Sequence, residues 1–121
     1  MPEEAHDDVL AALYDLVAAI HANRDMEQVI LERAKAIRAA RQAGLPYRSI
    51  VQSEHRPLLV ELLRENQQRL TGAGSRFRRA EAAALRGEGL TLDQIAALFG
   101  VTRQRVIALV RAHSESADET G

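Results

Sequence analysis

The chain has 121 residues and a formal net charge of −1; 46% of its residues are hydrophobic, 27% charged and 3% aromatic. A core with so few rings must be aliphatic, and the 21 alanines and 15 leucines favour helices over a β-sandwich or barrel. The absence of cysteine excludes a disulfide, a thiolate nucleophile and a cysteine zinc site.

Charge is distributed unevenly along the sequence. Residues 1–23 carry five acidic residues and no lysine or arginine, and residues 114–121 carry three more acidic residues. Between them, residues 24–74 have a net charge of +3 and residues 75–113 a net charge of +4. This pattern favours an anion-binding surface on the middle and C-terminal parts, with merely solvated arginine-rich helices as the alternative.

Apolar residues at helical spacing predict two helices before residue 44. The first covers residues 7–22, and the polar residues 23–25 interrupt the pattern. Asp25 and Gln28 are typical of an N-cap and its reciprocal partner, so a second helix is expected to run from there to about Ala43.

The middle of the chain predicts a short helix to about residue 52 and a leucine-rich helix that begins near Pro57. Residues 71–75, Thr-Gly-Ala-Gly-Ser, predict a flexible joint after it. Residues 1–70 are therefore expected to form a helical N-terminal part.

Three further helices are predicted after the joint, over residues 75–86, 91–99 and 102–113. The polar tail 114–121 is expected to be disordered. The fold class is therefore all-α with about seven helices, and residues 75–113 form the C-terminal unit.

A weak internal repeat relates the two halves. Residues 41–64 are similar to residues 86–111, with offsets of 45 and 47 on either side of a turn. Duplication of one three-helix unit explains this similarity, and chance similarity of leucine-rich helices is the alternative. The first copy lacks the glycine turn of the second, so residues 41–66 are expected to be a degenerate copy.

Residues 90–111 predict two short helices that cross at a tight turn. Ala96 lies where the crossing requires a small side chain, and Gly100 lies where the turn needs a positive φ. Apolar residues occupy the positions that pack the pair on its support: Ile95, Phe99, Val101, Val106 and Leu109. The pattern therefore predicts a helix-turn-helix.

The second helix of this pair is left with a polar outer face, formed by Thr102, Arg103, Gln104, Ile107, Ala108 and Arg111. Arginine can bridge both guanine acceptors in the major groove, and glutamine can pair with adenine. A threonine at a helix start, together with the free backbone amides there, suits a phosphate.

Residues 90–111 resemble the DNA-binding helix-turn-helix of bacterial sigma-factor region 4 and related regulators. Recognition helices of that family often open with a Val-Thr/Ser-Arg-x-x-Val pattern, and here residues 101–106 are Val-Thr-Arg-Gln-Arg-Val. The resemblance implies that Arg103 and Gln104 approach base edges while Thr102, Arg105 and Arg111 hold phosphate. It covers about 22 residues, and no other stretch resembles the remaining regions of a sigma factor.

The expected function is sequence-specific binding of double-stranded DNA by a bacterial transcriptional regulator, with the helix 102–112 in the major groove. A cluster at the start of the supporting helix, Arg76, Arg78 and Arg79, is expected to contact flanking phosphate, with a solvated surface as the alternative. The alternative function is an adaptor that docks on another transcription or signalling protein through its leucine-rich helices.

No nucleophile, base and orienting group stand together in the sequence, and the four histidines lack ligand spacing, so neither an enzyme nor a metal or cofactor site is expected. No signal peptide or membrane span is indicated, so we expect a cytoplasmic, nucleoid-associated protein.

The broad apolar face of residues 7–22 predicts a homodimer, with one chain of tandem units as the alternative. Contact with RNA polymerase or a regulatory protein is a further expectation.

Overall fold

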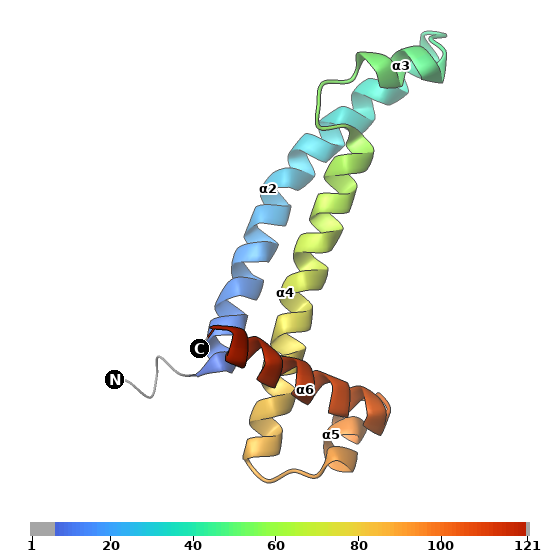
Figure 1. The fold of residues 1–121 in the computed structure, drawn as a ribbon. Coiled ribbons are helices and arrows are strands. Elements are labelled where there is room, and N and C mark those ends of the chain that lie inside the picture. The colour runs from blue at the N-terminus through green and yellow to red at the C-terminus, as the bar shows by residue number, and fades with distance from the viewer. Residues whose placement is uncertain (1–6, 121) are drawn as a thin grey trace. The chain divides into compact units, whose positions relative to one another are not determined.

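The computed structural model describes residues 7–120, with side chains up to residue 116, and every regular element in that range is a helix. The helices are α2 (Asp8–Gln42), α3 (Tyr47–Ser53), α4 (Leu59–Gly87), α5 (Leu92–Phe99) and α6 (Arg103–Thr120) (Figure 1). The all-α prediction is confirmed for these residues. The chain divides into two compact units: the hairpin unit, Ala18–Thr71, and the split unit, which joins the residues up to Val17 with those from Gly72 onward.

Five helices stand in the described residues where seven were predicted, and the first difference is the continuity of α2. This helix runs through residues 23–25, so Asp25 is not an N-cap. Asn23 Nδ2 donates to Asn66 O at 2.9 Å, and Asn23 Oδ1 accepts from Arg69 Nη1 at 2.8 Å. A side chain that bonds another helix does not compete with its own backbone, which explains why this asparagine leaves the helix intact.

The second difference is that α4 continues through residues 71–75, the predicted joint. Of the described glycines, only Gly44, Gly89 and Gly100 have positive φ, so the two glycines of this stretch keep helical backbone. Glycine weakens a helix by about 1 kcal/mol without forbidding it. Ala73 between them is fully buried, which favours the uninterrupted helix, and Ser75 lies inside it rather than at its start.

The third difference concerns the polar tail, which was predicted to be disordered from residue 114. α6 continues to Thr120 instead. No glycine or proline follows Gly100 until the last residue, so the sequence contains no stop signal for this helix.

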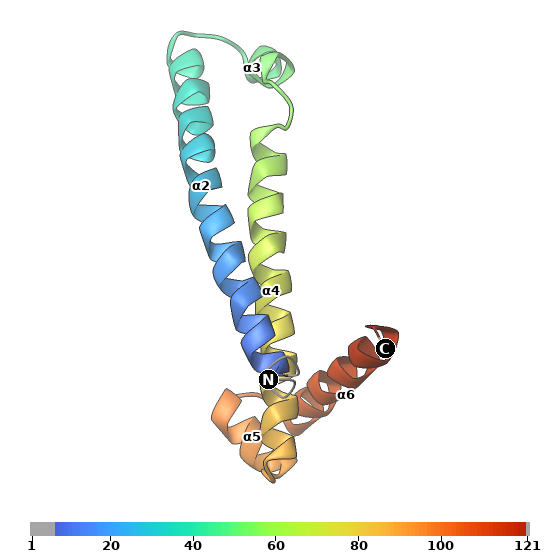
Figure 2. The ribbon, with the colours of Figure 1, turned by 90° about the vertical axis from the view of Figure 1, so that its left-hand side faces the viewer.

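Within the hairpin unit, residues 18–42 of α2 and 59–71 of α4 lie side by side and run in opposite directions (Figures 1 and 2). The residues of the seam between them are spaced alternately by three and four, the spacing of an antiparallel helix pair. On α2 these residues are Ala19, Asn23, Met26, Ile30, Arg33, Ile37 and Ala40, and on α4 they are Leu59, Leu62, Asn66 and Arg69.

Arg33 fixes the connection between α3 and α4. Its Nη1 donates to Glu54 Oε1 at 3.2 Å and to the backbone oxygens of His55 at 3.1 Å and Pro57 at 3.0 Å. Glu54 Oε1 also accepts from Leu59 N at 3.0 Å, where α4 begins. Because the Arg33 and Glu54 side chains are only 19% and 7% exposed, this ion pair is shielded from solvent.

The split unit has a small aliphatic core built by α4, α5 and α6. Its buried members are Ala82, Ile95, Ala96, Val106 and Leu109. Partly buried residues pack around them: Leu85, Leu90, Leu92, Phe99 and Val110. No buried polar or charged residue is found among the described residues, so apolar contact alone fills this core.

We expect Arg33→Ala to lower the free energy of unfolding by about 1–3 kcal/mol, because it removes the cation paired with a shielded carboxylate and the donor to two carbonyl oxygens. Urea unfolding followed by far-ultraviolet circular dichroism measures the change. Lys35→Ala removes an exposed cation from the same helix and is the matched control. Equal stability of the two variants would contradict the role given to Arg33.

Candidate nucleic-acid interface

The start of α5 is fixed by a reciprocal pair of hydrogen bonds. Thr91 Oγ1 accepts from Gln94 N at 3.1 Å, and Thr91 N donates to Gln94 Oε1 at 2.8 Å. This capping box satisfies two backbone donors and sets the first residue of the helix. The predicted start of this helix at Thr91 is therefore confirmed.

The end of α5 is fixed by Gly100, whose φ of 68° and ψ of 35° are left-handed. A side chain rarely adopts this backbone, and glycine does so at little cost. Val101 N donates to Ala96 O at 3.1 Å across the turn, so the chain reverses tightly between α5 and α6. Ala96 itself is 8% exposed in the core, as a close crossing requires.

Thr102 caps the next helix. Its Oγ1 accepts from Arg105 N at 3.1 Å, which is the geometry of an N-cap. The hydroxyl proton is still available to donate to an anion, and the remaining amides of the first turn point the same way. The helix N-terminus that was expected to hold phosphate therefore has one of its donors already satisfied from within.

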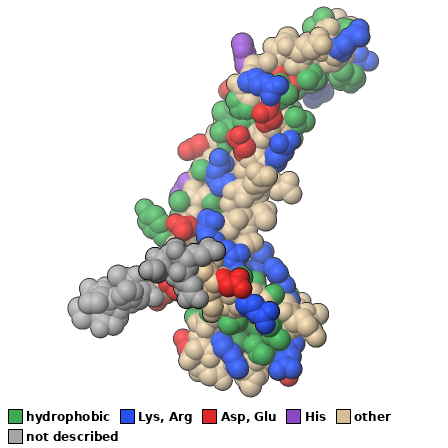
Figure 3. Space-filling view, viewed as in Figure 1, with side chains coloured by type: hydrophobic (Ala, Val, Ile, Leu, Met, Phe, Trp, Pro, Cys, Tyr) green, Lys and Arg blue, Asp and Glu red, His purple; other side chains and the backbone are tan. Residues whose placement is uncertain are grey.

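The outer face of α6 follows the predicted pattern of exposure with one difference. Thr102, Arg103, Gln104, Arg105, Ala108 and Arg111 are exposed, whereas Ile107 is half-buried. Gln104, Ala108 and Arg111 share a face because they are spaced by four and three residues. No acidic residue occurs between Arg103 and Arg111, so this stretch is purely cationic. In the lower part of Figure 3, blue cationic side chains border green hydrophobic ones.

Asp93 lies beside this face, on the first turn of α5. Its Oδ1 is 3.7 Å from Arg103 Nε, and the two side chains are 82% and 60% exposed. An ion pair that long and that exposed contributes little to stability. Asp93 could not be predicted as a neighbour of Arg103 from the sequence, because the turn at Gly100 brings together residues ten positions apart.

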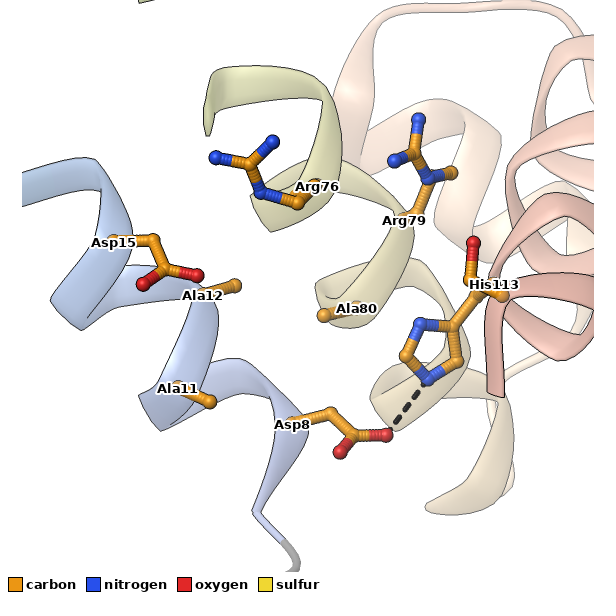
Figure 4. Close-up of a pocket in the computed structure, with 9 residues that line it drawn as sticks. Asp8, Ala11, Ala12, Asp15, Arg76, Arg79, Ala80 and His113 are labelled. Carbon is orange, nitrogen blue, oxygen red and sulfur yellow. Dashed lines mark hydrogen bonds and ion pairs between the residues drawn. The ribbon is translucent and has the colours of Figure 1, made fainter. Parts of the chain in front are cut away.

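The arginine cluster of α4 does not gather at the outer face of α6. Arg76 and Arg79 line a pocket of about 370 Å³ together with Asp8, Asp15 and His113 (Figure 4). Its remaining lining residues are Ala11, Ala12, Ala80 and Ser116.

His113 closes one side of this pocket, where its Nε2 donates to Asp8 Oδ2 at 2.9 Å. His113 is two residues beyond Arg111, about 200° around α6, so the pocket lies on the inner side of that helix. Arg78 is exposed on α4 and does not line the pocket. No sequence signal links Asp8 to His113, which lies 105 residues away.

The region of the expected degenerate copy, residues 41–66, contains α3 and the start of α4. The connection between them has no glycine, and Glu54 supplies its helix-capping oxygen. The exposed cation of this turn, Arg56, pairs with Glu61 through Nη1 and Oε1 at 2.7 Å. The ion pair of Arg56 is therefore closer than that of Arg103 on the outer face of α6, which spans 3.7 Å.

Metal binding and membrane spanning are two other properties on which the described residues bear. No group of three or more histidine and acidic side chains there could hold a metal ion. None of the helices described has the length and apolar character to cross a membrane. No family model, curated protein or solved structure matches the chain, so the geometry and the sequence carry the functional interpretation.

We expect Ala96→Leu to destabilise the split unit by about 1–3 kcal/mol, because three more heavy atoms cannot fit at the crossing of α5 and α6. Thermal unfolding by circular dichroism measures the change. Ala97→Leu adds the same side chain at the next, exposed position and should leave the melting temperature nearly unchanged. Equal melting temperatures for both variants would show that the crossing has room to spare.

Proposed function

We propose that the chain is a sequence-specific DNA-binding protein, with α5 and α6 as a helix-turn-helix and α6 as the helix that enters the major groove. The observation that carries this proposal is the outer face of α6. It exposes three arginines and a glutamine on a helix whose start is fixed by Thr102, Gly100 and a buried crossing. A rigid cationic helix of this kind matches the width of the major groove.

The chemistry of the face divides into two roles. Arg103 and Gln104, in the first turn, have the donor patterns that pair with guanine and adenine edges. Arg105 and Arg111 are single cations suited to phosphate, and Thr102 adds the helix N-terminus. Binding at particular DNA sequences suits a regulator of transcription. Such a regulator would contact RNA polymerase after it has bound its site.

A second candidate function is an adaptor that docks on another transcription or signalling protein. The observation that favours it is the exposure of large aliphatic side chains in the hairpin unit, including Val60 at 61% and Leu63 at 50%. An adaptor of this kind would not need the cationic outer face of α6. Affinity for duplex DNA therefore separates the two functions.

The test is selection of duplexes from a random library by the full chain, followed by fluorescence anisotropy on the enriched sequence. We expect one enriched motif, with affinity that falls steeply as salt rises because phosphate contacts release counterions. Binding without sequence preference, or no binding at all, would overturn the proposal. The adaptor function would then be the one to examine.

We expect Arg103→Ala and Gln104→Ala each to weaken binding to the selected duplex by about 1–3 kcal/mol, with much smaller effects on random duplex. Both side chains are exposed, so the fold should be unaffected. Arg64→Ala removes an exposed arginine from the hairpin unit and is the control for lost charge. Unchanged discrimination in both α6 variants would contradict the base-reading assignment.

We expect Asp93→Asn to tighten DNA binding by up to about fivefold, or roughly 1 kcal/mol, since it removes both a competitor for Arg103 and a charge that repels phosphate. Glu88→Gln removes an exposed carboxylate elsewhere in the same unit and controls for net charge. Anisotropy at one fixed salt concentration compares the two. A larger gain from Glu88→Gln would show that Asp93 has no special place.

A further inference from the structure

The hairpin unit carries a second apolar stripe beside its seam. Ile20 and Leu31 on α2, and Val60, Leu63 and Leu70 on α4, each follow a seam residue by one position. Their exposed fractions range from 43% to 61%. These five side chains are the same kind as those of the core, yet nothing in the hairpin unit covers them.

The α2 residues and the α4 residues of this stripe lie on the same face of the hairpin. One residue advances a side chain by about 100° in a right-handed sense along each helix. Because the helices run in opposite directions, a residue that follows a seam residue by one position points to the same side of the hairpin on α2 and on α4. Hydrogen bonds from Asn23 to Asn66 and from Arg33 to Pro57 set which residues are level along the pair.

When α2 and α4 are aligned by these hydrogen bonds, Ile20 lies beside Leu70 at one end of the face, and Leu31 lies beside Val60 at the other. A groove of about 400 Å³ continues the face beyond Leu31. It is lined by Ala34, Ile37, Arg38, Arg41, Gln42, Tyr47 and Leu59. The open face therefore extends over most of the length of the hairpin.

The hairpin unit has too little core to be complete alone. Only Ala19, Ile50 and Leu62 are buried in this unit, which the structure describes throughout. Two helices cannot enclose a core, whereas four can, and monomeric proteins rarely expose contiguous apolar patches above a few hundred Å². A second pair of helices over this face would supply the missing layer.

The charges on the face select a second copy of the same chain as that layer. Along α2 the stripe consists of Ile20, Arg24, Glu27 and Leu31. When a second copy runs in the opposite direction, its apolar, acidic, basic and apolar residues match this order position by position. In an antiparallel contact about a two-fold axis, Arg24 faces Glu27 of the second copy and Ile20 faces its Leu31. An isologous interface requires this kind of self-complementarity.

We propose that this face, formed by Ile20, Arg24, Glu27, Leu31, Val60 and Leu63, is the interface of a homodimer, in which two hairpins pack antiparallel as a four-helix bundle. In the same register, Val60 faces Leu70 of the second copy. On α4, Leu63 is the apolar residue nearest the two-fold axis, so its two copies lie close together. This interface does not depend on DNA binding, and all but one of its named residues lie beyond residues 7–22, the segment expected to form it.

The first test uses the absence of cysteine from the chain. Leu63→Cys places one thiol near the axis, and Val29→Cys places one at a similarly exposed position on α2. Val29 is two residues before Leu31, about 200° around the helix and off the face. A short bis-maleimide should couple two Leu63→Cys chains much faster than two Val29→Cys chains. Equal rates would overturn the proposal.

The second test is sedimentation equilibrium of the full chain in the micromolar range. The native chain should have the mass of two chains, and Leu63→Glu should weaken association by about 100-fold, because it buries a charge without a partner. Val29→Glu should leave the mass unchanged. A monomeric native chain, or equal weakening by the two variants, would overturn the proposed interface.

Charge reversal tests the antiparallel register. Arg24→Glu should weaken the dimer, because it brings like charges together, and the double variant Arg24→Glu, Glu27→Arg should restore it. Failure of the double variant to recover association would overturn this register. Neither result depends on DNA, so a chain that dimerises without binding DNA would reject the proposed function and keep this one.

Discussion

The constraint on which the structure depends is that its helices meet at alanine. Of the eleven buried hydrophobic residues in the described chain, six are alanines: Ala12, Ala19, Ala73, Ala80, Ala82 and Ala96. Alanine lets helix backbones approach closely, but it buries little apolar area and so contributes little of the hydrophobic free energy. Five of the six lie in the split unit, and the hairpin unit buries only Ala19, Ile50 and Leu62. Both units must therefore obtain their stability and their register partly from other interactions.

Polar side chains fulfil that need in the hairpin unit. Asn23 and Arg69 join the two helices near one end of the seam, and Arg33 binds the connection before α4 at the other. Such bonds are directional, so they define which residues are level more strictly than aliphatic contacts do. In the split unit, the Thr91 capping box and the left-handed backbone of Gly100 set the start and the end of α5.

The features that could be predicted from the sequence are those fixed by near neighbours. The capping box at Thr91 and the turn at Gly100 involve partners within a few residues, and both are visible in the order of side chains. The continuity of α2 could not be predicted, because the partners of Asn23 lie more than forty residues away. The continuity of α4 through the glycines of residues 71–75 could not be predicted for the same reason, since the burial of Ala73 depends on the packing around α4.

The candidate site divides in the same way. Exposure along α6 follows helical periodicity, so Arg103, Gln104 and Arg111 could be predicted as outer residues. Arg76 and Arg79 could not be placed, because the pocket that they line with Asp8 and Asp15 is formed by segments far apart in the sequence. A run of arginines in a sequence indicates a high local positive charge, while the surface on which that charge lies depends on the fold.

The unbroken extension of α6 makes the helix electrically asymmetric along its length. Its first turns carry three arginines, and the first acidic side chain, Glu115, follows one turn after Arg111. A polyanion therefore exerts a torque on the helix, attracting the start and repelling the end, over distances up to a Debye length of about 8–10 Å at physiological salt. Orientation on approach is thus biased before any contact forms, and the bias fades as ionic strength rises.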